Sequence, residues 1–323
     1  MLFTGSIAAY TVRDIEDRMQ IFFAVIFIFV GFVLSIFITG LERGLPFSLI
    51  LPQLLLGLVN AITAPLLTYS LVVLFNRFKT GMINNLLLKE FLSKEHPLVT
   101  QMKETAVGTF EHSREVSRLA ALIAKEINAN ALLTRVGAMF HDIGKMFYPE
   151  NFTENQDLFP NLPKDKLTPQ ESAKKIITHV QLGIEEAKRQ NLPPTIIDFI
   201  PQHHGTFIVK HFYNVALNES LESANVVNEN DFRYPGPIPQ YKETAILMIS
   251  DLAEALSKSA TNWEAFEELF EKNLDERIKD GQFDESGLTL NDFKVAKSII
   301  YQEIKGKVQT RTQYAIAKTK DDK

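Results

Sequence analysis

The chain has 323 residues, a length typical of about two domains, and its mean hydropathy is close to zero. Its formal net charge is −5, which disfavours a nucleic-acid polymer as a partner bound through its phosphates. It contains no cysteine, and this excludes disulfides, zinc fingers, iron–sulfur clusters and a thiol nucleophile. A metal site in this chain would therefore use His, Asp or Glu ligands.

The first long apolar segment lies near the N-terminus. No charged residue occurs over 20–41, and the central part, Ile21 to Thr39, is almost wholly apolar. About 20 apolar residues are enough for a helix to cross the hydrocarbon core of a bilayer. The segment has no polar face, unlike a surface helix of a soluble domain, and it is too long for the apolar region of a signal peptide. We therefore predict a transmembrane helix rather than a buried core helix or a signal peptide.

A second uncharged segment follows over 44–76 and contains Pro52, Gly57 and Pro65. It is too long for one upright span and too short for two, so it predicts a single kinked or tilted helix. Because the link to the first helix is short, residues 20–76 are expected to form a transmembrane hairpin. The lipid bilayer is thus an expected partner.

Basic residues flank this hairpin on both sides. Arg13 and Arg18 precede it, and Arg77 and Lys79 follow it, whereas the link between its helices holds a single arginine. The positive-inside rule then places both ends in the cytoplasm. Residues 1–19 would be a cytoplasmic lead-in or the end of an earlier span.

The composition after residue 77 is that of a soluble protein with helical patterning. We expect a linker helix over 77–100, an all-α domain over 101–315 and a frayed charged tail over 316–323. The sequence TPQE, beginning at Thr168, is a capping box with proline at the first helical position, and it predicts a helix through Gln190. Other helices are predicted over 111–127, 195–202, 243–257, 262–279 and 290–305, and a rigid proline-rich loop over 232–239.

Histidines and aspartates carry the candidate chemistry. His141 and Asp142 are adjacent at the end of an apolar helical pattern, and His203 and His204 are adjacent before a glycine. Asp251 lies on a largely apolar predicted helix, where a buried carboxylate needs a partner such as a metal ion. Imidazoles and carboxylates without thiolates suit Fe, Mn or Zn. Six or more such ligands suggest two ions, the arrangement that hydrolyses phosphoesters.

The candidate ligands occur in the order His112, His141-Asp142, His179, His203-His204 and Asp251. This order resembles that of the HD-domain metal phosphohydrolases. The surrounding motifs are GTFEHS at 108–113, AMFHDIGK at 138–145, DFIPQHHG at 198–205 and DFRYPGP at 231–237. Together they are similar to those of the seven-transmembrane HD family, over roughly residues 15–315.

The resemblance implies an all-α HD-domain helical bundle with a dinuclear metal site, preceded by a transmembrane helical hairpin. It implies hydrolysis of cyclic di-AMP to linear pApA at the cytoplasmic face of a bacterial membrane, with two divalent ions, Fe or Mn. Carried over residue by residue, it assigns one ion to His112, His141, Asp142 and Asp251. Asp142 would bridge to a second ion, whose further ligands would be His179, His203 and His204.

Three further residues are candidates for substrate chemistry. Lys145 follows the His-Asp pair by about one helical turn and, by the resemblance, would neutralise phosphate charge beside the catalytic Asp142; a solvated lysine is the alternative. Arg233 and Tyr234 lie in the predicted proline-rich loop, where they could stack on a base or contact a phosphate. A structural lid that packs on the helices would explain the same loop.

The chain departs from the family in two respects. Family members have seven spans and a large extracytoplasmic domain, so we expect a member shortened at its N-terminus. The residues after His204 lack the Gly-Tyr-Pro segment of relatives that cleave cyclic di-GMP, which argues against that substrate. The alternatives are an HD hydrolase of another nucleotide, such as guanosine tetraphosphate or a deoxynucleoside triphosphate, a nucleotide-binding membrane receptor, or an inert partner of envelope machinery. A homodimer is also compatible with the sequence, with contacts through the predicted transmembrane helices or through the terminal helices.

Overall fold

The computed structural model describes residues 18–77, 88–89, 91–92, 96–159, 167–223 and 226–321. The chain divides into two compact units, Met1–Glu90 and Phe91–Lys323, each of which is described by itself. Most of the expected linker helix over 77–100 and nearly all of the lead-in over 1–19 lie outside the described residues.

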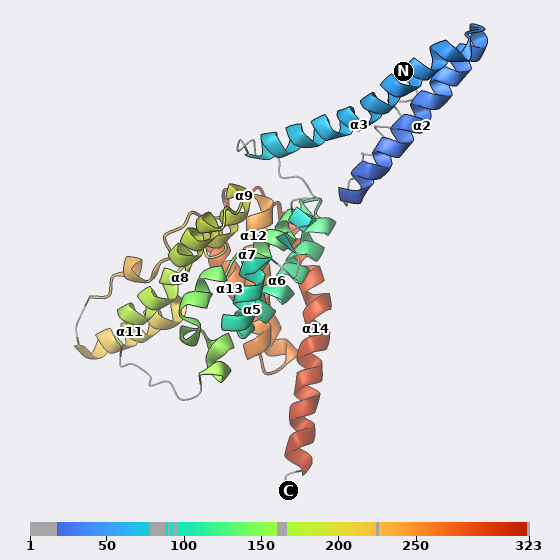
Figure 1. Cartoon of the computed structure of the whole chain (residues 1–323). Coiled ribbons are helices and arrows are strands. Elements are labelled where there is room, and N and C mark those ends of the chain that lie inside the picture. The colour runs from blue at the N-terminus through green and yellow to red at the C-terminus, as the bar shows by residue number, and fades with distance from the viewer. Residues whose placement is uncertain are drawn as a thin grey trace. The chain divides into compact units, whose positions relative to one another are not determined.

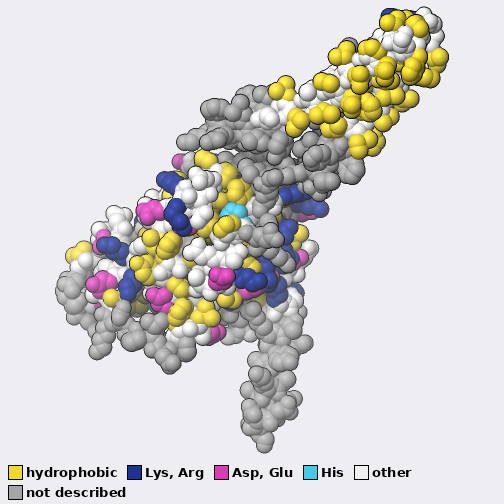
Figure 2. Space-filling view, in the orientation of Figure 1, with side chains coloured by type: hydrophobic (Ala, Val, Ile, Leu, Met, Phe, Trp, Pro, Cys, Tyr) yellow, Lys and Arg dark blue, Asp and Glu magenta, His cyan; other side chains and the backbone are white. Residues whose placement is uncertain are grey.

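The first unit contains two long apolar helices that pack on each other, α2 (Arg18–Glu42) and α3 (Phe47–Arg77) (Figure 1). A Cβ added at Gly57 of α3 would lie 3.3 Å from the Cβ of Phe32 in α2, so the glycine allows a close approach of the two helices. Hydrophobic side chains cover the outer surface of this pair (Figure 2). Both predicted helices are therefore present, and both carry apolar surface that faces outward.

Both helices are long and apolar in sequence. Among the described residues, one segment, Val25–Glu42 of α2, is long and apolar enough to cross a membrane by length and composition. In α3 the apolar segment found within the described residues is Phe47–Thr63. The second span therefore stays a prediction.

The second unit is all-α, as predicted, and no strand occurs among its described residues. Its α-helices are α5 (Pro97–Thr105), α6 (Val107–Glu126), α7 (Ala131–Phe140), α8 (Pro169–Arg189), α9 (Pro194–Ile197), α10 (Phe199–Gln202), α11 (Lys210–Ser223), α12 (Lys242–Ser259), α13 (Trp263–Lys279) and α14 (Leu290–Asp321). Its 3₁₀ helices are η1 (Ile143–Phe147), η2 (Pro149–Asn151), η3 (Thr153–Leu158) and η4 (Glu229–Phe232).

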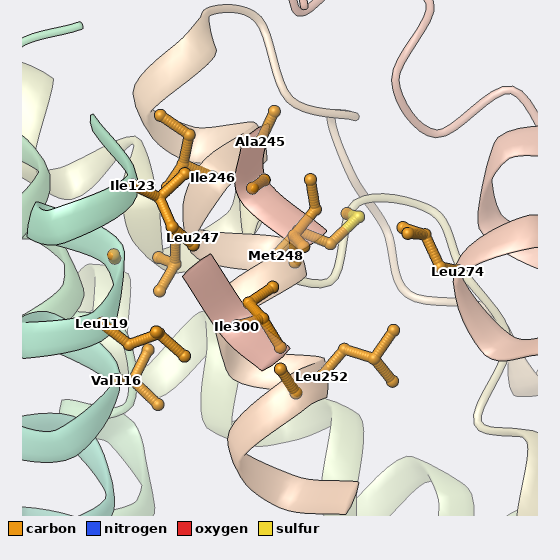
Figure 3. Packing of buried hydrophobic residues seen from close by; sticks show 14 of the residues in the cluster. Val116, Leu119, Ile123, Ala245, Ile246, Leu247, Met248, Leu252, Leu274 and Ile300 are labelled. Carbon is orange, nitrogen blue, oxygen red and sulfur yellow. The ribbon is translucent and has the colours of Figure 1, made fainter. Parts of the chain in front are cut away.

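Helix α12 is the centre of this domain, and α6, α7, α13 and α14 pack around it. Leu119 and Ile123 of α6 lie opposite Ile246 and Leu247 of α12, and Ile300 of α14 closes another side (Figure 3). A helix covered on several sides needs apolar residues around most of its circumference, which explains the apolar run that begins α12. The polar residues of α12 that remain buried are therefore costly unless they have partners.

The start of α8 follows the sequence prediction. The Thr168 side chain accepts a hydrogen bond from the Glu171 backbone N–H, and the Glu171 carboxylate accepts one from the Thr168 backbone N–H. Further along, Gly144 of η1 lies directly against α8, because a Cβ there would come 1.8 Å from the His179 carbonyl oxygen. This contact brings the residues after His141 next to His179.

Three elements differ from their predictions. Helix α6 begins at Val107, not at residue 111, so His112 lies in its second turn rather than its first. Helix α14 continues to Asp321, through most of the segment expected to fray, since no proline interrupts it. Helix α11 was not predicted, because its sequence lacks a clear amphipathic period.

Candidate metal centre

The buried carboxylate of Asp142 is the centre of the site. Its Oδ2 lies 3.0 Å from Nε2 of His141 and 3.6 Å from Nε2 of His112. Its Oδ1 lies 3.3 Å from Nε2 of His179 and 3.5 Å from Nε2 of His203. The two oxygens of one carboxylate therefore face two different groups of imidazoles, which is the arrangement that a bridging ligand requires.

Three of these imidazoles are oriented by the backbone. In His141, His179 and His203, Nδ1 lies 2.7, 2.6 and 2.6 Å from the carbonyl oxygen three residues earlier. A carbonyl oxygen only accepts, so Nδ1 carries the proton and the lone pair of a neutral ring is on Nε2. All three Nε2 atoms are buried and make no hydrogen bond, and the same is true of Asp142 Oδ1. Unpartnered buried acceptors are costly, and a cation among them would remove that cost.

His112 is held in a different way. Its Nε2 lies 2.9 Å from Oδ1 of Asp251, and its Nδ1 lies 2.5 Å from Oε2 of Glu254. Burial by itself would lower the pKa of His112, but the hydrogen bonds to Asp251 and Glu254 outweigh burial and raise the pKa to about 10. Glu254 was not predicted as a site residue, although it lies three residues after Asp251 and so on the same side of α12. It orients His112 much as the backbone carbonyls orient the other histidines.

His203 and His204 are neutral at neutral pH. Burial lowers the pKa of His203 to about 4 and holds the pKa of His204 well below its usual range. The ring of His204 stacks on Tyr234, with ring centroids 4.1 Å apart. Neutral imidazoles are the form that binds a metal ion.

The structure brings all the predicted ligands together. Within each of three groups, one ligand atom per residue lies within 4.8 Å of the others. These overlapping groups are Asp142, His179, His203 and His204; His112, His141 and Asp142; and His141, His203 and Asp251. The cluster of these seven residues, which we call the Asp142 cluster, has the donor types and density suited to divalent metal ions.

Lys145 is bound within the site. Its Nζ donates to Asp142 Oδ2 at 2.8 Å and to Glu154 Oε1 at 2.9 Å, and its side chain is only 12% exposed. Burial would lower the pKa of Lys145, but the Asp142 and Glu154 carboxylates outweigh it and raise the pKa above its ordinary value. The reading of Lys145 as a solvated surface residue is therefore wrong. Glu154, which the sequence analysis did not single out as a charge partner, places this cation beside the Asp142 cluster.

Arg233 does not have the free guanidinium that a substrate contact needs. It donates to Glu229, Asp280 and the carbonyl oxygen of Thr206 through five hydrogen bonds. Arginine has five N–H donors, so none is left for a phosphate. The geometry therefore does not support the substrate contact predicted for Arg233. Its bonds tie the loop after His204 to the end of α13. Tyr234, by contrast, stays against the Asp142 cluster through His204.

The HD domain family matches residues 109–256, which contain every residue of the Asp142 cluster. Cyclic-di-AMP phosphodiesterase PgpH of Listeria monocytogenes is 39% identical over 236 residues, covering 72% of this chain and 32% of that protein. The solved structure of its HD domain in complex with cyclic-di-AMP superimposes with a TM-score of 0.62 and 39% identity, covering 66% of this chain and 99% of that one. The chain belongs to the HD-domain family.

A second PgpH matches a larger part of this chain. Cyclic-di-AMP phosphodiesterase PgpH of Bacillus subtilis is 34% identical over 285 residues, covering 88% of this chain and 38% of that protein. The chain thus spans about a third of the length of the curated relatives that it matches.

Proposed function

We propose that this chain is a metal-dependent phosphodiesterase that hydrolyses cyclic di-AMP to pApA. The observation that carries the proposal is the Asp142 cluster, in which three buried Nε2 atoms and a carboxylate oxygen lack hydrogen bonds. The names of the two PgpH relatives, and the HD-domain complex with cyclic-di-AMP, support the choice of substrate.

We propose two divalent ions, Fe or Mn, as the cofactors. One would be held by His112, His141 and Asp251 and the other by His179, His203 and His204, with Asp142 shared between them. When bound, such a pair polarises a phosphodiester and activates water for attack. Lys145 would balance the negative charge of the phosphate from its fixed position beside Asp142, and Tyr234 would contact the substrate at the other edge, over His204.

The membrane assignment is part of the same proposal. Helices α2 and α3 would cross a bacterial cytoplasmic membrane as a multi-pass hairpin and keep the catalytic domain in the cytoplasm. The apolar segment of α2 and the basic residues that flank the hairpin support this placement. A homodimer would be compatible with it and is tested by light scattering of the purified chain.

The deciding experiment uses the full chain in detergent, loaded with Mn²⁺ or Fe²⁺. Cyclic di-AMP and cyclic di-GMP are supplied separately, and the products are separated by chromatography. We expect selective formation of pApA from cyclic di-AMP. Absence of turnover in metal-loaded protein would contradict the proposal and favour another nucleotide substrate or a receptor.

Asp142→Asn is the variant with the largest expected effect. It keeps the shape of the side chain but removes the charge that faces both groups of imidazoles. We expect metal content and turnover to fall together, the turnover by roughly a thousandfold or more, because both ions would lose a charged ligand. Asp275→Asn, an exchange of the same kind in an exposed pair with Lys279, is the control and should change neither quantity. An Asp142→Asn protein that keeps metal and activity would exclude a bridging role.

A further inference from the structure

A second arginine lies near the Asp142 cluster. Arg277 is in the last turn of α13, and its guanidinium carbon lies 4.1 Å from the centroid of the Phe207 ring. Its Nη1 donates to the Asn273 carbonyl oxygen at 3.1 Å. Among the described residues this is the one hydrogen bond that its side chain makes, and no ion pair with a carboxylate accompanies it. Most of its five donors are therefore open.

Phe207 and Tyr234 connect Arg277 to the candidate ligands. The Tyr234 backbone N–H donates to the Phe207 carbonyl oxygen at 3.1 Å, and the Tyr234 ring stacks on His204. Burial lowers the pKa of Arg277 to about 10, while the nearby Asp251 carboxylate acts in the opposite direction. The guanidinium thus stays cationic at neutral pH and lies within electrostatic reach of the Asp142 cluster.

Two cations, Lys145 and Arg277, lie within electrostatic reach of the Tyr234 hydroxyl. Burial raises the pKa of this hydroxyl, and Lys145 and Arg277 are the two cations whose charges oppose that rise. Lys145 is bound to Asp142 and Glu154, whereas Arg277 has no such carboxylate contact. An anion bound at the cluster would therefore share Lys145 with two carboxylates, whereas Arg277 has no carboxylate contact to share.

We propose that Arg277 is a substrate-binding residue whose guanidinium holds a phosphate group of the nucleotide at the Asp142 cluster. The inference rests on the proposed function, because it takes the substrate to be a phosphodiester bound at that cluster. A guanidinium binds phosphate through two parallel N–H donors, and its plane must be oriented for this. The Phe207 ring and the Asn273 carbonyl supply that orientation before substrate arrives.

Arg233 and Arg277 differ in how many of their hydrogen-bond donors are left for a ligand. Both lie near the loop that follows His204, Arg233 through the Thr206 carbonyl and Arg277 through the Phe207 ring. Arg233 uses all its donors to hold that loop in place, which makes it a positioning residue. The flat face of the Arg277 guanidinium packs on the Phe207 ring of the loop. Most of its N–H donors are left for a ligand.

The test compares Arg277→Gln, Arg277→Lys and the wild type as full chains in detergent, loaded with Mn²⁺. The probes are inorganic phosphate, whose Kd is measured by calorimetry, and cyclic di-AMP, for which KM and kcat are measured. Lys279→Gln removes an exposed cation two residues away and is the matched control. Manganese content and the thermal midpoint are recorded for each protein.

We expect Arg277→Gln to raise the phosphate Kd and the KM for cyclic di-AMP by roughly 10- to 100-fold, the size expected for loss of a charged hydrogen bond. Manganese content should not change, Arg277→Lys should recover part of the affinity, and Lys279→Gln should leave all values within about twofold of wild type. An unchanged phosphate Kd in Arg277→Gln would overturn the inference. So would loss of manganese or of the thermal transition in both Arg277 variants, since Arg277 would then be structural.

The two proposals fail in different ways. Wild-type turnover of cyclic di-AMP with a normal KM in Arg277→Gln would refute the role of Arg277 and leave the proposed activity intact. Wild-type protein that does not cleave cyclic di-AMP, yet binds phosphate in an Arg277-dependent manner, would refute the substrate and keep the phosphate site.

Discussion

The two units of this chain place the same kinds of side chain in opposite positions. In the α2–α3 pair, Phe37 is 54% exposed and Leu56 is 70% exposed, whereas Phe266 and Ile300 in the HD domain are fully buried. The HD domain forms its own apolar interior from helices that surround α12. The described helical pair leaves its apolar side chains exposed, as a contact with an apolar phase such as the proposed bilayer would require.

The two units also differ in how their polar groups are hydrogen-bonded. In the helical pair, the hydroxyls of Thr39, Thr63 and Ser70 donate to the carbonyl oxygen four residues earlier, so each is satisfied within its own helix. In the HD domain, the Nε2 atoms of His141 and His179 are buried without a hydrogen bond. These three hydroxyls of the helical pair therefore need no partner outside their own helix, while the HD domain leaves its candidate ligand atoms open for a cation.

The largest expected effect in the folded core is that of Phe266→Ala. Phe266 is fully buried and its ring stacks on Phe270 at a centroid distance of 5.7 Å. We expect a loss of about 3–5 kcal/mol in the free energy of unfolding of the HD domain, measured by chemical denaturation of the full chain in detergent. Leu290→Ala, at a position that is 83% exposed, should cost less than about 0.5 kcal/mol. Equal losses at the two positions would break the contrast between buried and exposed apolar residues.

A charge in α2 tests the proposed membrane insertion and should leave the HD domain unchanged. Leu34 is about half exposed in the apolar segment Val25–Glu42. Leu34→Arg should weaken membrane insertion by about 2.5–3.5 kcal/mol, the cost of an arginine at the centre of a span. The measurement is the fraction of protein that stays in membranes after alkaline extraction, with Leu34→Ala as the control. Retention of the Arg variant at wild-type levels would argue against a transmembrane α2.

Glu254→Gln tests the second partner of a candidate ligand. The Glu254 carboxylate holds Nδ1 of His112, and the amide would weaken that contact without a change in side-chain shape. We expect manganese affinity to fall by about 10- to 100-fold, the usual effect of loss of such a partner. Calorimetric titration of metal-free protein measures it, and Glu264→Gln in the exposed start of α13 is the control. An unchanged affinity would show that His112 needs no orientation by Glu254.

The smallest expected effect is at the N-terminus of α8, at a residue outside the Asp142 cluster. Thr168→Ala removes the hydroxyl that accepts from the Glu171 backbone N–H at the start of α8. We expect a loss of about 1 kcal/mol in the free energy of unfolding, measured by chemical denaturation, because capping interactions contribute that much. Thr168→Ser retains the hydroxyl and should restore most of the stability. No loss in the alanine variant would mean that α8 is held by packing alone.

Much of the local structure, and the residue types of the candidate metal ligands, could be predicted from the sequence. The uncharged segments predicted both long N-terminal helices, and the capping box at Thr168 predicted the start of α8, because these signals depend on residues close together in the chain. The candidate ligands could also be identified, since their order and motifs are those of HD phosphohydrolases. The fold then buries these side chains in one site and orients them. Their residue types already suit a metal ion.

Tertiary structure decided which atoms meet. Glu254 pairs with a residue 142 positions earlier in the chain, and Arg233 pairs with Asp280, 47 positions later. No local pattern encodes such distances, so the sequence suggested Arg233 for a role in which its donors are not free and passed over Arg277. The physical reason is that a side chain has a limited number of donors and acceptors. Which of them remain open for a substrate depends on every partner that the fold brings within hydrogen-bond distance.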